Sequence, residues 1–71
     1  MALTYEFLTA RADEAAREAK NAKLENVRLR AERSEAAWRD MASRALRIQQ
    51  DRTAREREKE RERQEAESQT A

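Results

Sequence analysis

The chain has no glycine and no proline among its 71 residues. Glycine supplies the positive φ angles of many turns and helix ends, and proline ends helices because it lacks an amide donor. A sequence that lacks both and is rich in Ala, Glu, Arg and Leu is typical of α-helices. The composition therefore predicts an all-α protein.

Cysteine and histidine are also absent. The first absence excludes disulfides, thiolate metal sites and thiol catalysis. The second removes the commonest general base and the commonest metal ligand. Glu14, Glu18, Glu32 and Glu35 could suggest a carboxylate site, but bundle di-metal sites use glutamates together with histidines. We predict no catalytic residue, no metal and no cofactor, and hence no enzyme.

The chain has no excess of one charge and no long apolar run. Its 16 basic and 15 acidic residues leave a net charge of +1, whereas nucleic-acid-binding domains usually show a clear basic excess. No apolar stretch approaches the roughly 20 residues that cross a bilayer. The first residues lack the basic start and apolar stretch of a secretory signal. We expect a cytoplasmic protein that has no membrane partner and is unlikely to bind nucleic acid.

Large apolar side chains are few, and all of them precede residue 49. They are Met1, Leu3, Tyr5, Phe7, Leu8, Leu24, Val27, Leu29, Trp38, Met41, Leu46 and Ile48, beside 15 alanines. A core this thin normally needs a disulfide, a metal or a second copy of the chain. With the first two excluded, self-association remains.

The first helix is predicted to start at Thr4, a residue type favoured at the N-cap. Leu3 and Leu8 have the spacing of a hydrophobic staple around that cap, and Glu6 places a negative charge in the first turn. From there, apolar and small residues alternate in steps of three and four. This first seam contains Tyr5, Leu8, Ala12, Ala15, Ala19 and Ala22.

A second seam with the same alternation is out of phase with the first. It contains Leu24, Val27, Ala31, Ser34, Trp38, Met41, Ala45 and Ile48. The step of two from Ala22 to Leu24 swings the apolar face by roughly 200° on a continuous helix. We therefore predict a turn within residues 20–26, made by Asn21 or Asn26 because asparagine tolerates left-handed and capping conformations. The alternative is one long continuous helix in a coiled coil.

The predicted fold is a helical hairpin with a longer second helix, self-associating into a helical bundle. Residues 1–50 form the hairpin and oligomerisation region. Residues 51–71 form a charged helical extension without a large apolar side chain, in which residues 55–63 alternate Arg or Lys with Glu. Such alternation places opposite charges at i+3 but like charges at i+4, so we expect this extension to fray, with residues 68–71 disordered.

Trp38 is the only tryptophan, and the alanines of the first seam offer a flat face against which it can pack. It is either a core anchor or a contact residue for a partner, where tryptophan is over-represented. Tyr5 and Phe7 point to different sides of their helix. Phe7, with Leu3 and Leu29, is the candidate for a second contact surface.

Two short segments resemble a class of short, uncharacterised bacterial proteins with a Tyr-x-x-Arg-Ala-x-x-Ala-type helix followed by an Ala-x-x-Trp-x-x-Met-Ala-type helix. The resemblance covers about residues 5–48, departs from the tighter Tyr-to-Arg spacing, and implies a helical hairpin without an activity. The matching residues are Tyr5, Arg11, Ala12, Ala15, Ala37, Trp38, Met41 and Ala42.

The sequence thus predicts a non-enzymatic protein–protein interaction module that forms a homo-oligomer, with a dimer favoured. The predicted interface residues are Tyr5, Leu8, Ala12, Ala15, Ala19, Leu24, Val27, Ala31, Trp38, Met41, Ala45 and Ile48. The alternative is a small RNA- or DNA-associated factor that contacts phosphates through a stripe on the second helix. That stripe contains Arg30, Arg33, Arg44 and Arg47.

Overall fold

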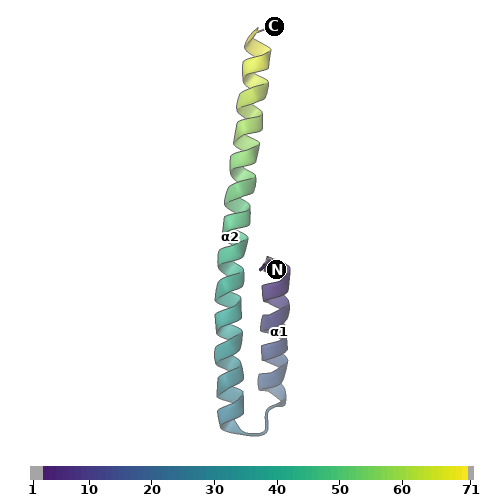
Figure 1. Cartoon of the computed structure of the whole chain (residues 1–71), viewed down its shortest axis with the longest axis vertical. Coiled ribbons are helices and arrows are strands. Elements are labelled where there is room, and N and C mark those ends of the chain that lie inside the picture. Colours follow the sequence, from purple (N-terminus) through teal and green to yellow (C-terminus); the bar gives the residue numbers. More distant parts are fainter. Residues whose placement is uncertain (1–2, 71) are drawn as a thin grey trace.

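The computed structural model describes residues 3–70, so Met1, Ala2 and Ala71 lie outside the described part. Helix α1 (Tyr5–Asn21) and helix α2 (Glu25–Thr70) run antiparallel, side by side, as a hairpin (Figure 1). The prediction of a helical hairpin with a longer second helix is confirmed. The alternative of one continuous helix is wrong.

Helix α1 begins where the sequence predicted. Thr4 has extended backbone (φ −80°, ψ 159°), and its hydroxyl accepts a hydrogen bond of 3.1 Å from the Phe7 amide. The Leu8 amide donates to the Thr4 carbonyl at 3.0 Å and closes the first turn. Thr4 thereby satisfies amides that lack a partner within the helix.

The connection between the helices is short and uses no left-handed residue. Asn21 is the last residue of α1 and Asn26 lies inside α2, while Ala22 leaves the helix through extended backbone (φ −70°, ψ 134°). No residue in the described range 3–70 has a positive φ angle. The prediction that an asparagine in the left-handed region makes the turn is therefore wrong. Residues 22–24 turn the chain with backbone angles that need no glycine.

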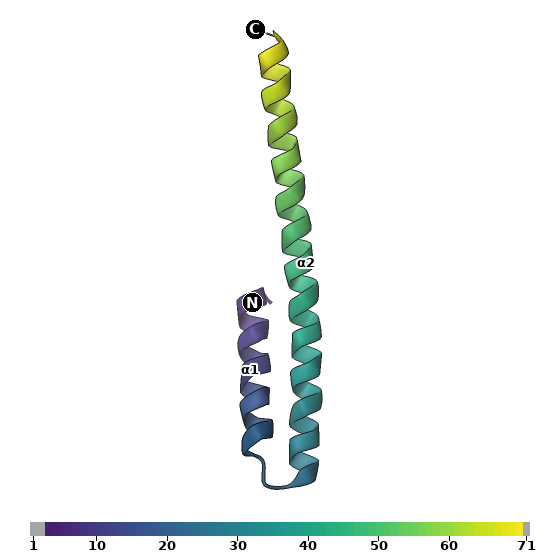
Figure 2. The ribbon, with the colours of Figure 1, turned by 180° about the vertical axis from the view of Figure 1, so that it is seen from behind.

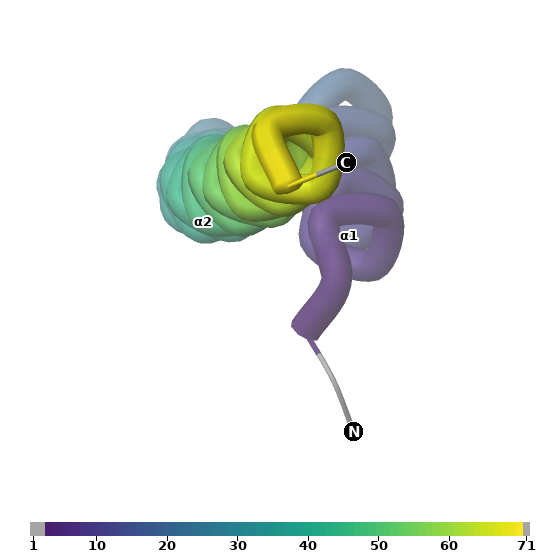
Figure 3. Tube along the Cα trace, turned by 90° about the horizontal axis from the view of Figure 1, so that it is seen from above, coloured from purple at the N-terminus to yellow at the C-terminus, as the bar shows by residue number. Residues whose placement is uncertain are grey.

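The molecule is elongated because α2 extends far beyond α1. Its Cα radius of gyration is 20.1 Å and its extents are 71 × 18 × 16 Å, whereas a compact chain of this length has a radius near 11 Å. Figure 2 shows α2 continuing alone past the start of α1. Seen from above, this part leans toward the side on which α1 lies (Figure 3). It is helical through Thr70, and the fraying expected for residues 68–71 stays a prediction, with Ala71 outside the described residues.

The core of the hairpin consists of small side chains. Among residues 3–70, Leu8 is the one large residue that is fully buried, and Ala12 has no exposed surface. The other buried residues in the described range are also alanines: Ala15, Ala19, Ala31 and Ala42. Alanine faces allow two helices to approach closely. The two helices of the hairpin are therefore held together more by close packing of small side chains than by the burial of large apolar groups.

Candidate interaction surface

The single chain buries part of the predicted interface and leaves part of it open. Five predicted residues are buried, namely Leu8, Ala12, Ala15, Ala19 and Ala31, and five are half-buried, namely Tyr5, Val27, Trp38, Met41 and Ala45. Leu24 and Ile48 are 69% and 61% exposed. The hairpin alone therefore does not bury these last two residues, and their place in an interface between two copies stays a prediction.

The contact face of α2 is shifted slightly from the predicted seam. Ala42 is buried, Met41 beside it is half-buried, and Ser34 is exposed where Glu35 is half-buried. Met41 and Ala42 lie three and four residues after Trp38, and both spacings fit a helical seam. The sequence spacing therefore could not show which of the two is buried. Close approach favours the alanine at the centre and moves the methionine to the rim.

Trp38 lies in an aromatic and cationic cluster at the edge of the hairpin. Its ring meets that of Phe7 edge-on, with centroids 6.3 Å apart and planes at 88°. The Arg11 guanidinium carbon lies 5.3 Å from the centroid of the Trp38 ring, which is cation–π geometry. The structure thus brings Phe7 to Trp38, whereas its position on the helix had predicted a separate contact surface for Phe7.

This edge of the hairpin forms a surface that we call the Trp38 face. A ridge of α1 contributes Phe7, Arg11, Glu14 and Glu18. A ridge of α2 contributes Arg30, Ser34, Trp38, Met41 and Ile48. Residues three and four apart are neighbours on a helix surface, which places each set on one ridge. A hollow of about 320 Å³ lies on this face and is lined by Arg11, Glu14, Ala15, Glu18, Ser34 and Trp38.

The opposite edge, the Arg39 face, is closed by ion pairs. The Arg39 guanidinium lies 2.8 Å from the Glu35 carboxylate and 3.3 Å from that of Asp13, so it bridges the two helices. The hydrogen bond that Arg39 donates to Glu35, followed by the one that it donates to Asp13, raises the pKa of Arg39, although partial desolvation opposes this. Glu35 and Arg39 are four residues apart on α2, whereas Asp13 reaches Arg39 across the hairpin from α1.

The four arginines of the stripe differ in their ion pairing. Arg44 pairs with Asp40 one helical turn before it, while Arg30, Arg33 and Arg47 form no ion pair within the part of the chain described here. Arg30 shares the α2 ridge with Met41, and Arg33 lies on the adjacent ridge. The stripe therefore borders a face whose other edge carries Glu14 and Glu18.

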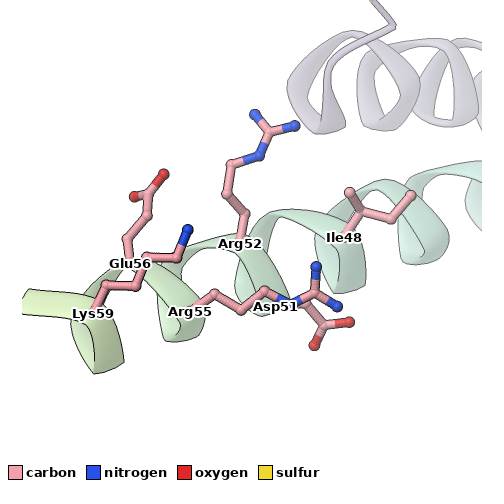
Figure 4. Close-up of a pocket in the computed structure, with 6 residues that line it drawn as sticks. All are labelled: Ile48, Asp51, Arg52, Arg55, Glu56 and Lys59. Atoms are coloured by element: carbon pink, nitrogen blue, oxygen red, sulfur yellow. The ribbon is translucent and has the colours of Figure 1, made fainter. Parts of the chain in front are cut away.

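Two further hollows meet at Ile48. One, of about 520 Å³, marks the start of α1 against α2 and includes Leu3, Tyr5, Ala45 and Ile48. The other, of about 450 Å³, lies along α2 alone (Figure 4), with Arg52 and Glu56 on the side toward α1. Its lining is Ile48, Asp51, Arg52, Arg55, Glu56 and Lys59. Apart from Ile48, this lining consists of charges of both signs on a single helix, and it has the form of a surface groove.

Over residues 3–70, no group of three or more acidic residues is placed to hold a metal ion. Neither helix in this range has a segment that combines the length and the apolar character needed to cross a bilayer. No family model, curated protein or solved structure matches the chain. The resemblance to short bacterial hairpin proteins therefore stays a prediction.

Proposed function

We propose that this chain is a non-enzymatic protein–protein interaction module that self-associates as a dimer of hairpins, forming a four-helix bundle. The observation that carries the proposal is the composition of the core. Leu8 is the one large residue fully buried, while Phe7, Trp38 and Met41 remain half-buried at the rim and Ile48 is exposed.

The energetic argument follows from those side chains. Complete burial of a large apolar side chain stabilises a fold by roughly 1.5–3 kcal/mol, and alanine contributes much less because its apolar area is small. Ordering each residue costs about 1–2 kcal/mol of backbone entropy, so a two-helix hairpin with one large buried residue gains little. Burying the rim residues against a second copy adds the missing apolar contact without a disulfide or metal.

The association of phosphates with the arginine stripe is the weaker alternative. Asp40 neutralises Arg44, and Glu14 and Glu18 stand on the same face as Arg30. Phosphate-binding surfaces gain affinity by releasing counterions from clustered positive charge, and nearby carboxylates oppose this.

Size-exclusion chromatography with light scattering over a wide range of protein concentrations tests the proposal. We expect a mass of twice the 8.3 kDa chain for the wild type, and a shift toward the monomer for Trp38→Ala. Leu29→Ala is the matched control, because position 29 is two and a half helical turns from Trp38 and so on the opposite side of α2. A stable, folded monomer at every concentration would contradict the proposal.

A parallel titration with single-stranded RNA at low and high salt addresses the alternative. Tight binding by a monomer that weakens steeply with salt would favour the phosphate-binding role over self-association. Absent or salt-independent binding would remove that role.

A further inference from the structure

We infer that the second copy docks on the Trp38 face, about a two-fold axis parallel to the helices, so that α1 of each copy lies over α2 of the other. This inference rests on the proposed self-association and adds which surface is used and in which orientation. Three features of the described residues support it: the apolar rim, the distribution of charge and the register of the hairpin.

The apolar rim distinguishes the two faces of the hairpin. On the Trp38 face, Phe7, Trp38 and Met41 are half-buried, and Ile48 continues their line at 61% exposure. On the Arg39 face, Leu46 is also half-buried, seven residues after Arg39, but there the charges of Asp13, Glu35 and Arg39 already satisfy one another. Covering the first face removes apolar surface from water, whereas covering the second would desolvate a completed ion-pair network.

The charges of the Trp38 face are arranged in two opposite edges. On the α1 edge, Glu14 already pairs with Arg11 at 3.0 Å, and Glu18 forms no ion pair within residues 3–70. Arg30 and Arg33 border the α2 edge and likewise form no ion pair within that range. A face with one acidic and one basic edge complements itself after a rotation that exchanges the edges. Such complementarity sets the register of an interface and disfavours wrong partners.

The register of the hairpin selects the axis. Arg11 lies level with Trp38, as their contact shows. Because the helices are antiparallel, Glu18, seven residues further along α1, is level with Ala31, between Arg30 and Arg33. A two-fold axis parallel to the helices keeps these levels and brings Glu18 of each copy to the arginines of the other. A perpendicular axis would instead set α1 against α1 and leave those arginines without acidic partners.

Charge reversal tests the docking face. E14R/E18R makes both edges basic, and R30E/R33E makes both edges acidic. Each variant alone should dimerise at least about tenfold more weakly, because like charges then oppose each other across the interface. An equal mixture should recover a heterodimer of near wild-type affinity, and one chain with all four changes should recover the homodimer.

The control E58R/E62R has the same charge change and spacing on the part of α2 beyond α1, and we expect it to dimerise like the wild type. Circular dichroism should report unchanged helicity for every variant, so that weaker association is not a consequence of unfolding. Failure of the mixture to recover association would overturn the pairing of α1 with α2 of the partner.

The axis has its own measurement. The chain has no cysteine, so Ser68→Cys gives one spin-label site near the end of α2. With an axis parallel to the helices, both α2 extensions project from the same end, and label-to-label distances stay within about 40 Å, as expected for neighbouring helices of roughly 10 Å diameter. Distances beyond the range of the method, in a proven dimer, would indicate the perpendicular axis and overturn the inference.

These measurements distinguish a failure of the proposed self-association from a failure of the proposed docking face. A wild-type protein that is monomeric throughout overturns the proposed function together with this inference. A wild-type dimer whose affinity is unchanged in E14R/E18R and R30E/R33E keeps the proposed function and overturns only the docking face.

Discussion

One helix, α2, passes through two very different environments. Up to Leu46 it packs on α1 and contributes Ala31 and Ala42 to the core, whereas beyond Thr53 every described residue is exposed. The paired part is stabilised by contact between helices and the projecting part by interactions within one helix. The comparison shows that a continuous helix does not imply a continuous source of stability.

The projecting part depends on helix propensity and local ion pairs. Glu58 pairs with Arg61, and Glu60 with Arg63 at 3.0 Å. The hydrogen bond that Arg61 donates to Glu58 raises the pKa of Arg61. A group whose pKa is raised on folding contributes its stability below its ordinary pKa and loses that contribution as pH rises through the raised pKa, and for arginine both lie far above the physiological range. These pairs should therefore add no pH dependence of stability in the physiological range through their arginines.

The largest expected effect on stability comes from a substitution in the core of the paired part. Leu8→Ala should lower the free energy of unfolding by about 3 kcal/mol, because it deletes the largest fully buried side chain. Thermal melts monitored by Trp38 fluorescence, at one fixed protein concentration, measure this change. The control Leu24→Ala removes the same atoms from a residue that is 69% exposed and should cost under about 0.5 kcal/mol. Equal losses in both variants would refute the assignment of the core.

A smaller effect should come from enlarging the closest contact. Ala12 is 0% exposed, so Ala12→Leu must separate the helices and should cost about 2 kcal/mol. The same substitution at Ala54, which is exposed on α2, should change stability by less than about 0.5 kcal/mol. Chemical denaturation of the two variants compares them directly. If Ala12→Leu stabilised the protein, the close approach of the helices would be wrong.

The smallest expected effect on the hairpin comes from breaking the projecting helix. Glu58→Pro removes a helical hydrogen bond and should lower total helicity, yet leave the Trp38-detected melting temperature within about 2 °C of the wild type. Ala36→Pro, at an exposed position in the paired part, should instead cost about 3 kcal/mol or more. A large loss from Glu58→Pro would mean that the projecting part supports the hairpin.

Much of the architecture followed from local patterns. The missing glycine and proline indicated helices, Thr4 marked the start of the first one, and the phase break between Ala22 and Leu24 indicated the change of direction. The way in which the chain turns did not follow. Extended backbone at Ala22 is open to any residue type, so it leaves no mark in the sequence and the asparagines were a misleading signal.

Only part of the candidate surface could be predicted from the sequence, for a related reason. Spacing identified Trp38 and most of the seam, but it could not choose between Met41 and Ala42, or place Phe7 and Arg11 on the Trp38 ring. Those choices depend on how closely and at what rotation two helices meet, which is set by packing between residues far apart in the chain. Helical periodicity depends on residues close together in the sequence. The sequence by itself therefore determined that the chain forms two helices, although it has no glycine or proline to make the turn between them. The tertiary structure alone decided which rim stays apolar and open and which is closed by Asp13 and Arg39.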